Sequence, residues 1–487
     1  MRPRLRFLDD ALAGRILDEA RSVLATLGVE LHDPEGLDLL ASHGATVEDG
    51  GKRVRIPEAL VDRALATAPR AFALHDVLGN RTHNLSGENV HFVPGSAAIR
   101  VLDPATGALR DPVTADYVRY TKLVAGLPNL AAQSTAFVPS DVPPEVSDSY
   151  RLFLGLLHCE KPVVTGAFSA EAFRVMLDLQ LAVRGTPEAL REKPLAVFTC
   201  CPTSPLAWSE ATGRNLLDCA RAGVPVEIVA VPLAGFLSPV TLNGTLVQGA
   251  AENLSGVVLH QLAAPGAPLL WGTSAAIFDI RSEAAATGAV ETAMLTSAMG
   301  ELGKRLGLPT QGYAGVSDAK ELDAQAGLEK TSGAFLAALT GVNSISGPGL
   351  LDLDNGFSLE KLVVDHEICG MALRLSAGIE PREDFPALPI LGELLAEKHL
   401  LIARHTRRHL RREITFPGPV VDRSSEARWR EDGGQSLLSR SAREVERIVG
   451  AWTPSRLPES ARTDLVSVMK AAARQAGLDT LPAREGP

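Results

Sequence analysis

The sequence predicts an α/β protein built on a (β/α)8 barrel, with a helical cap before the barrel and a helical extension after it. Short apolar or small-residue runs recur eight times between residues 90 and 346, about 36 residues apart, and helical patterns fill most of the intervals. Polar residues such as Asp318 and Ser346 gather where the later runs end, which is where barrel enzymes carry their chemistry. A doubly wound sheet would show the same alternation, but no GxGxxG motif opens a helix after the first run.

Residues 1–85 are expected to form the cap. Apolar side chains recur at helical spacing over residues 8–27, and Gly28 follows as a helix C-cap. The elements expected next are a helix over 34–42, strands over 45–47 and 53–56, and a helix over 57–68 with proline in its first turn. This part of the chain offers no catalytic constellation.

Residues 86–380 are expected to form the barrel that carries the site. The strand runs are residues 90–94, 131–139, 162–168, 195–201, 225–232, 268–273, 310–315 and 341–346. The helices expected around them are residues 147–157, 170–183, 208–222, 246–262, 289–306, 324–339 and 361–375. Several strand ends are rich in Gly, Pro and Ser, which leaves room for a ligand above the barrel.

Residues 381–487 are expected to form the helical extension. Amphipathic spacing predicts helices over 388–401, 439–452 and 460–476, with residues 481–487 as a tail. Residues 404–412 form the strongest basic cluster of the chain. Two interpretations stay open for this cluster: a solvated helical face, or a contact for an acidic partner protein or subunit.

Composition excludes several classes of function. The net charge of −10 disfavours a nucleic-acid footprint. No uninterrupted apolar run of about 18 residues appears, so we expect no membrane span. The basic N-terminus runs straight into Asp9 and Asp10 without the apolar segment of a signal peptide, and we expect a cytoplasmic protein.

Metal chemistry is not indicated by the sequence. The five cysteines show neither CxxC nor Cys/His finger spacing, and we expect buried, reduced thiols. HExxH, GxSxG and P-loop motifs are also absent. We therefore expect no metal site and no tightly bound cofactor.

Candidate polar residues lie at or beyond the ends of the later strands. Asp318 and Lys320 follow the seventh strand, and Lys320 is a possible Schiff-base lysine, although a lysine at a loop edge is more often solvated. Glu291 lies in the first turn of the helix after the sixth strand, where the helix dipole also favours a carboxylate. His366 follows the eighth strand between two acids, and its alternative interpretation is structural.

Four segments together carry a resemblance to a known family. They are residues 102–107 (LDPATG), residues 315–330 (GVSDAKELDAQAGLEK), residues 359–371 (LEKLVVDHEICGM), and Asp422-Arg423 followed by Trp429. In this order they resemble the trimethylamine methyltransferase family. The founding enzymes of that family carry pyrrolysine, whereas this chain has only the twenty standard residues and is similar to the non-pyrrolysine branch, which includes glycine betaine methyltransferase.

The resemblance implies a (β/α)8 barrel that moves a methyl group from an amine to the Co(I) centre of a separate corrinoid protein. A quaternary amine such as glycine betaine is the expected substrate, since it already has a neutral tertiary amine as leaving group. Catalysis would then consist mainly of positioning the cation. The cobalamin would belong to the partner protein, and we further expect a homo-oligomer.

Aromatic faces and carboxylates hold cations of this kind. The aromatic candidates are Phe92, Trp271, Tyr313 and Phe357, for each of which core packing is the other interpretation. Asp318 is the expected counter-charge and His366 the expected ligand of a substrate carboxylate; we place both in the catalytic set and Glu291 in the substrate-binding set.

Two other functions remain open on the sequence alone. One is a barrel that binds a quaternary amine without turning it over. The other is a lyase or aldolase that forms a Schiff base through Lys320.

Overall fold

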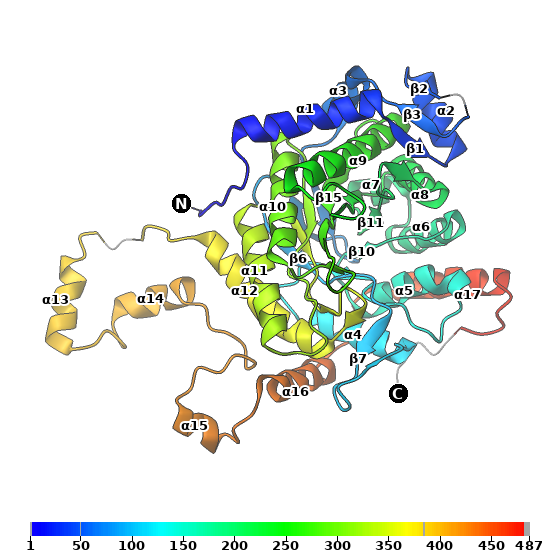
Figure 1. Ribbon diagram of the computed structural model, residues 1–487. Helices are drawn as coiled ribbons and strands as arrows, with labels where there is room; N and C mark the ends of the chain where they lie inside the picture. The colour runs from blue at the N-terminus through cyan, green and yellow to red at the C-terminus, as the bar shows by residue number, and fades with distance from the viewer. Residues whose placement is uncertain (1, 49, 383–384, 482–487) are drawn as a thin grey trace.

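The computed structural model describes residues 2–48, 50–382 and 385–481, so the expected tail lies outside the described residues except for Leu481. Eight parallel strands form a closed ring at the centre (Figure 1). In chain order these strands are β6 (His91–Val93), β9 (Gln133–Ser134), β10 (Val163–Thr165), β11 (Ala196–Cys200), β13 (Val226–Ala230), β15 (Leu269–Thr273), β18 (Gln311–Tyr313) and β19 (Ser344–Ser346).

Two parallel bridges close the ring. Five strands pair in the order β15-β13-β11-β10-β9 and three in the order β18-β19-β6. The bridge Trp271↔Thr310 joins β15 to the residue before β18, and the bridge Phe92↔Leu130 joins β6 to the segment just before β9. The eight-stranded barrel predicted from the sequence is therefore confirmed.

Helices cover the outside of the ring. They are α4 (Thr114–Ala125), α5 (Pro144–His158), α6 (Ala170–Arg184), α7 (Pro187–Glu192), α8 (Glu210–Ala222), α9 (Leu242–Ala263), α10 (Val290–Arg305), α11 (Ala324–Leu339) and α12 (Leu359–Ala377). Local sequence sets several of their starts: the side chains of Ser169, Ser209 and Asp323 accept hydrogen bonds from backbone N–H groups in the first turns of α6, α8 and α11. At the end of α8, Gly223 adopts the left-handed conformation that terminates the helix.

A hairpin closes the amino-terminal end of the barrel. Its strands are β4 (Phe72–His75) and β5 (Arg81–Leu85), and the backbone N–H of His75 donates to Pro194 O just before β11. Leu74 and Leu85 pack in an inner cluster with Val93, Ala132, Val164, Val197 and Leu270. This hairpin was not predicted from the sequence. Because it fills the amino-terminal end of the ring, only the carboxyl-terminal end is left for a ligand.

The cap lies over one side of the barrel. It comprises α1 (Asp10–Thr26), β1 (Val29–Leu31), α2 (Pro34–Ser42), β2 (Thr46–Val47), β3 (Arg53–Arg55) and α3 (Glu58–Thr67). Helices α1 and α3 pack on α9, as Figure 1 shows for α1. Strand β1 also pairs in parallel with β12 (Ala207–Trp208), which lies in a loop of the barrel.

Short hairpins lie in the loops that follow the barrel strands. Their strands are β7 (Arg100–Leu102), β8 (Leu109–Arg110), β14 (Leu233–Ala234), β16 (Ala276–Asp279), β17 (Ala284–Ala286), β20 (Leu350–Leu351) and β21 (Gly356–Phe357). Strand β21 pairs with β7, and β16 pairs with β14. Because they tie together loops far apart in the sequence, these pairs stiffen the open end of the barrel.

The extension divides into two parts. Helices α16 (Leu437–Gly450) and α17 (Glu459–Gln475) pack against the barrel helices, whereas α13 (Leu388–Glu397) and α14 (Arg404–Glu413) project away from it (Figure 1). The short helix α15 (Glu426–Glu431) connects these parts. Helix α13 ends earlier than the sequence predicts, because Lys398 adopts a left-handed conformation at its C-cap.

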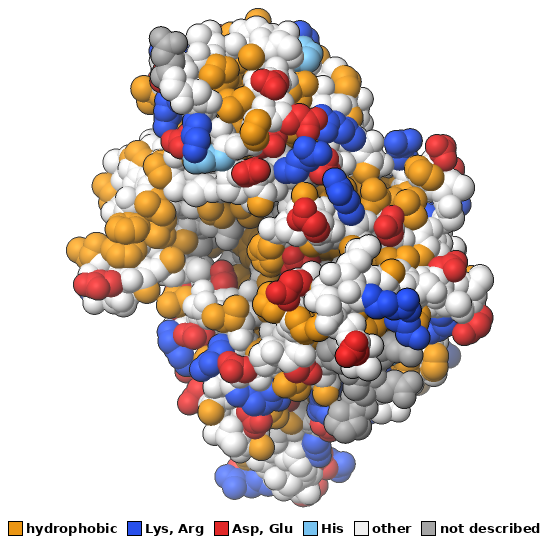
Figure 2. Space-filling model, turned by 90° about the vertical axis from the view of Figure 1, so that its right-hand side faces the viewer, with side chains coloured by type: hydrophobic (Ala, Val, Ile, Leu, Met, Phe, Trp, Pro, Cys, Tyr) orange, Lys and Arg blue, Asp and Glu red, His pale blue; other side chains and the backbone are white. Residues whose placement is uncertain are grey.

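Acidic and basic side chains are interspersed over the face of the molecule that Figure 2 shows. Hydrophobic side chains gather there around a hollow. No helix among the described residues is both long and apolar enough to cross a membrane.

Candidate active site

Polar side chains line the carboxyl-terminal half of the barrel interior. Successive side chains of a strand point alternately to the outer helices and into the barrel. Ile228 faces α9 and Gly312 faces α10, so their neighbours Glu227 and Tyr313 point into the barrel. The same parity turns Ser346 inward, since its neighbour Ile345 packs in the outer core. We call the resulting set the mouth cluster, and its members are Thr199, Glu227, Gln311, Tyr313 and Ser346, together with Ser96 and Asp354 from the loops.

Glu227 is the central acid of the mouth cluster. It is fully buried, and its Oε1 accepts a hydrogen bond of 2.6 Å from Thr199 Oγ1. Its Oε2 makes no hydrogen bond within the described chain. Burial raises the pKa of Glu227 to about 7, because the ionised form loses its hydration and gains only one donor. A cation bound nearby would offset this cost.

Asp354 is a second acid at the same end; the residue is half-buried and its Oδ1 is fully buried. It lies in the hairpin between β20 and β21, where Asp352, Leu353 and Asp354 have φ values of 50°, 58° and 69°. Three consecutive non-glycine residues with positive φ are strained, and the surrounding hairpin must hold them there. Burial, reinforced by the negative charge of Asp318, raises the pKa of Asp354 to about 7.

Tyr313 adds an aromatic ring near both acids. Its hydroxyl donates a 2.9 Å hydrogen bond to Ser96 O, which orients the ring in the mouth. Burial and the nearby negative charge of Glu227 raise the pKa of the phenol above its usual range. The phenol therefore stays neutral, and its ring offers a face to a cation.

Four buried polar atoms in this region make no hydrogen bond within the described chain. They are Glu227 Oε2, Gln311 Nε2, Ser346 Oγ and Asp354 Oδ1. Buried polar groups in proteins are normally paired, so a cluster of exceptions marks a place where a ligand or water belongs. The cluster therefore identifies the candidate substrate site.

Asp318 lies beside the mouth cluster but is already engaged. Its Oδ1 accepts hydrogen bonds from Thr287 N, Thr287 Oγ1 and Gly288 N at 2.7 to 3.0 Å. These bonds hold the loop that leads into α10. Its negative charge still affects the site, because it raises the pKa of Asp354. Of the residues predicted from the sequence, Tyr313 belongs to the mouth cluster, and Asp318 lies near another member of it, Asp354.

Three predicted aromatic residues lie in the core and not in the mouth. Trp271 is fully buried on the outer face of β15, where its indole N–H donates to Met299 O at 3.0 Å. Phe92 packs outward from β6, with Lys330 Nζ 5.6 Å from its ring centroid. Phe357 packs edge-on against Tyr120 at 5.4 Å. We leave these three aromatic rings out of the proposed site.

His366 and Glu291 lie apart from the mouth cluster. His366, on α12, lines a separate cavity of 440 Å³ that the C-terminal extension borders, and its Nδ1 is 3.8 Å from Glu367 Oε1. Glu291 lies in the first turn of α10, half-buried. Because His366 lines a different cavity and Glu291 lies at the start of a helix, we propose no catalytic role for them.

Lys320 lacks the surroundings of a Schiff-base lysine. Its side chain is 61% exposed and 3.7 Å from Asp352 Oδ1, and its Nζ donates to Asp318 O at 2.7 Å. A lysine that forms a Schiff base is usually desolvated in an apolar pocket or beside another cation. This solvated, ion-paired geometry disfavours the lyase alternative.

Sequence reasoning missed Glu227 and Gln311. The available signal was Glu227 itself, one charged residue in the fully buried run Val226–Ala230. Burying a charge costs folding free energy, so a charged residue in such a strand indicates a function.

No group of three or more His, Cys, Asp or Glu side chains suited to a metal ion occurs among the described residues.

Comparisons with known proteins identify the family. The family model described as trimethylamine methyltransferase (MTTB) matches residues 1–477. Trimethylamine methyltransferase MttB of Desulfitobacterium hafniense is 30% identical over 448 residues, covering 92% of this chain and 90% of that protein. Glycine betaine methyltransferase of the same species is 29% identical over 459 residues, covering 94% of this chain and 95% of that protein.

A solved structure supports the fold alone. The monomethylamine methyltransferase MtmB of Methanosarcina barkeri superimposes with a TM-score of 0.52 at 10% identity, covering 98% of this chain and 90% of that chain.

The MttB of Methanosarcina thermophila is 32% identical over 86% of this chain and 87% of its own length. The protein is therefore a methyltransferase and belongs to the trimethylamine methyltransferase (MTTB) family.

Proposed function

We propose that this protein moves a methyl group from a quaternary amine of the glycine betaine type to the Co(I) centre of a separate corrinoid protein. One observation carries the proposal: Glu227, a buried carboxyl with an unpaired oxygen, points into the open half of the barrel together with Tyr313, since their neighbours Ile228 and Gly312 face the outer helices. The family membership supplies the reaction class.

A quaternary ammonium suits this arrangement because it has no N–H group. It cannot be held by hydrogen bonds, so a site must hold it by charge and by aromatic faces. Glu227 and Asp354 supply the charge once they ionise, and Tyr313 supplies an aromatic face of the kind that contributes roughly 0.5–2 kcal/mol. A bound cation would lower the pKa of both carboxyls, so that binding and ionisation favour each other.

The chain's own residues have little covalent chemistry to perform. The N–CH3 bond breaks with its electron pair left on nitrogen, so the amine departs as a neutral tertiary amine without needing a proton. The corrinoid of the partner supplies the electron pair of the new bond to carbon. The mouth cluster orients one methyl group outward and excludes water, which is catalysis by positioning.

The rim of the mouth supports a protein partner at this end. Phe168, Phe236, Val240 and Ile280 are exposed on loops that follow β10, β13 and β15. Phe236 and Phe278 also stack, with ring centroids 4.8 Å apart and an interplanar angle of 21°. Large exposed apolar side chains gathered around an opening are typical of an interaction surface. A partner that covers this rim would meet the methyl group.

The proposal is tested with a panel of quaternary amines and reduced Co(I) cobalamin, free and bound to corrinoid proteins. Methyl transfer is followed by the spectral change of cobalamin. We expect transfer from at least one amine, and its loss in Glu227→Gln but not in the exposed control Glu321→Gln. Binding of an amine without transfer to any acceptor would support the non-catalytic alternative, and no binding at all would contradict the proposal.

A further inference from the structure

The hairpin that carries Asp354 is fastened to α12 at its root. The root is Gly349, just before β20, whose backbone N–H donates to Asp365 Oδ2 at 2.7 Å. The carbonyl of Gly349 accepts a 3.0 Å hydrogen bond from the backbone N–H of Ser358, just after β21. Glycine is required here, because its φ is 93° and a Cβ would lie 2.3 Å from the ring of Phe357. Asp365 thus anchors the point where the hairpin begins.

The anchoring carboxylate is itself paired within α12. One helical turn earlier, Lys361 Nζ donates to the same oxygen, Asp365 Oδ2, at 2.6 Å. The two side chains are 0% and 1% exposed. A buried ion pair seldom adds stability over an apolar pair of the same volume, so its presence beside the hairpin points to a role other than packing.

A second lysine leaves these buried charges unbalanced. Lys330 of α11 is fully buried, and its Nζ makes no hydrogen bond within the described chain. Burial lowers the pKa of Lys361, the charge of Asp365 opposes this change, and the charge of Lys330 adds to it. When the two lysines and Asp365 are ionised, the group carries one positive charge in excess.

Asp354 is placed to balance this charge. Burial and the negative charge of Asp318 raise the pKa of Asp354, whereas the positive charge of Lys361 lowers it. Three further ionisable side chains lie around the turn that carries Asp354: Tyr313, Asp352 and Lys320. The last two pair with each other at 3.7 Å. Lys361 is therefore the cation that favours the ionised form of Asp354 from behind the hairpin.

We propose that Lys361 and Asp365 are positioning residues for the carboxylate of Asp354. Asp365 fixes the root of the hairpin through Gly349, and Lys361 supplies the counter-charge that lets Asp354 ionise near Asp318. The link to catalysis rests on the proposed function, in which ionised Asp354 helps to hold a quaternary amine. The effects on the hairpin and on the carboxyl concern the free protein and need no ligand.

Two double variants separate the anchor from the charge. Lys361→Met/Asp365→Asn removes both charges but keeps an amide oxygen that can accept from Gly349 N. Lys361→Met/Asp365→Leu removes that acceptor as well. Because each variant replaces the pair together, neither leaves one partner of the pair buried and uncompensated.

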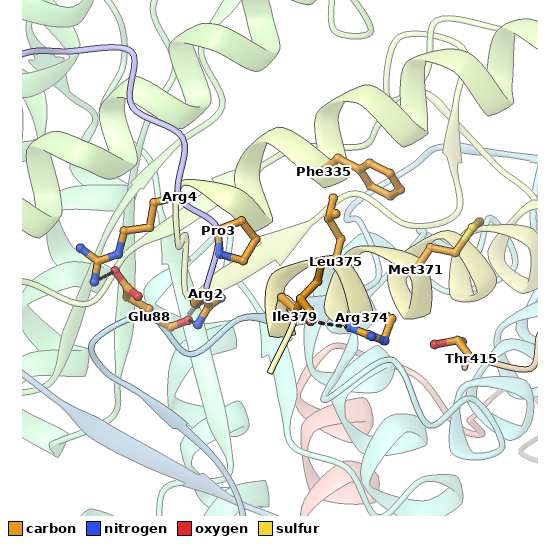
Figure 3. A pocket seen from close by; sticks show the side chains of 11 residues that line it. Arg2, Pro3, Arg4, Glu88, Phe335, Met371, Arg374, Leu375, Ile379 and Thr415 are labelled. Atoms are coloured by element: carbon orange, nitrogen blue, oxygen red, sulfur yellow. Dashed lines mark hydrogen bonds and ion pairs between the residues drawn. The ribbon is translucent and has the colours of Figure 1, made fainter. Parts of the chain in front are cut away.

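A matched control comes from the other end of the same helix. Arg374→Met/Glu413→Gln removes an ion pair of 3.7 Å that lies about 20 Å further along α12. Figure 3 shows Arg374 there, beside the cavity that Met371 and Leu375 line. The control should leave both the hairpin and Asp354 as in the wild type.

The titration of Asp354 tests the role of Lys361 without any ligand. It is followed by carbon-13 NMR of labelled aspartate, and Asp354→Asn identifies the resonance. In both double variants we expect the midpoint to rise by about one pH unit from its value of about 7, because the counter-charge is gone. A midpoint that stays at the wild-type value would overturn the role of Lys361.

Hydrogen exchange of residues 350–357 tests the role of Asp365. We expect exchange about ten-fold faster or more in Lys361→Met/Asp365→Leu than in Lys361→Met/Asp365→Asn, which should match the wild type because its anchor remains. Equal exchange in the two variants would show that the hairpin does not depend on this anchor and would overturn it.

Amine binding separates this inference from the proposed function. With glycine betaine and tetramethylammonium as probes, affinity at pH 7 should fall about five-fold in Lys361→Met/Asp365→Asn and approach that of the wild type by pH 9. The reason is that a midpoint one unit higher leaves about a tenth of Asp354 ionised at pH 7 instead of half. No binding by the wild type would contradict the proposed function alone, since the two ligand-free measurements still decide the inference. A shifted Asp354 titration with an unshifted binding profile would overturn the link between the pair and the substrate.

Discussion

The binding of a quaternary amine should depend steeply on pH between 6 and 8, because Glu227 must ionise to hold it. The pKa of Glu227 is about 7 without ligand. A cation roughly 4.5 Å away, at an effective dielectric of about 20, interacts with a carboxylate by about 4 kcal/mol, equivalent to more than two pKa units. Ligand binding therefore drives the carboxyl to ionise and release its proton.

The direction and size of the pH dependence of binding follow from the fraction of each carboxyl that is ionised. Affinity should fall about ten-fold from pH 8 to pH 6 for each carboxyl that must ionise, so up to about 100-fold if Asp354 also takes part. At pH 7, about half a proton should be released per carboxyl. Calorimetry in two buffers of different ionisation enthalpy measures both the affinity and the proton count.

Glu227→Gln removes the titrating group and should remove its share of the pH dependence together with most of the affinity. Glu321→Gln, an exposed acid, should keep the wild-type profile. Constant affinity from pH 6 to pH 8 in the wild-type protein would refute the reasoning, because a buried, high-pKa carboxyl could not then be the cation's partner.

Three further predictions concern the mouth cluster and its rim. The pKa of Glu227 in the folded protein is about 7, above the ordinary 4.5, so its ionisation lowers the free energy of unfolding as pH rises from 4.5 through 7. The loss is about 3 kcal/mol once the carboxyl is fully ionised. Urea unfolding should therefore show Glu227→Gln more stable than wild type at pH 8 and little changed at pH 4. Tyr313→Phe keeps the ring and should bind the amine within a few-fold of wild type, whereas Tyr313→Leu should lose roughly 0.5–2 kcal/mol by calorimetry. Phe236→Ser/Ile280→Ser should slow methyl transfer to protein-bound Co(I) cobalamin but not to free cobalamin; equal slowing of both would argue against docking at the rim.

Local patterns in the sequence are enough to predict the architecture. The eight strand runs and the helices between them are visible because burial imposes periods of 2 and 3.6 on neighbouring residues. Capping residues such as Ser169 and Gly223 act within one turn of their own helices, so their roles are also local. The plugging hairpin Phe72–Leu85 was missed because its apolar residues resemble an ordinary surface pair until the ring closes around them.

The composition of the site depended on tertiary structure. Strand parity within the closed ring sends Trp271 outward to the helices and Glu227 inward, although an aromatic residue looks the better cation ligand in isolation. His366 follows the eighth strand closely, yet its helix turns it toward the C-terminal extension. Periodicity along one segment determines which elements form, but which side chains meet depends on how distant segments close into a ring, and that information is not local.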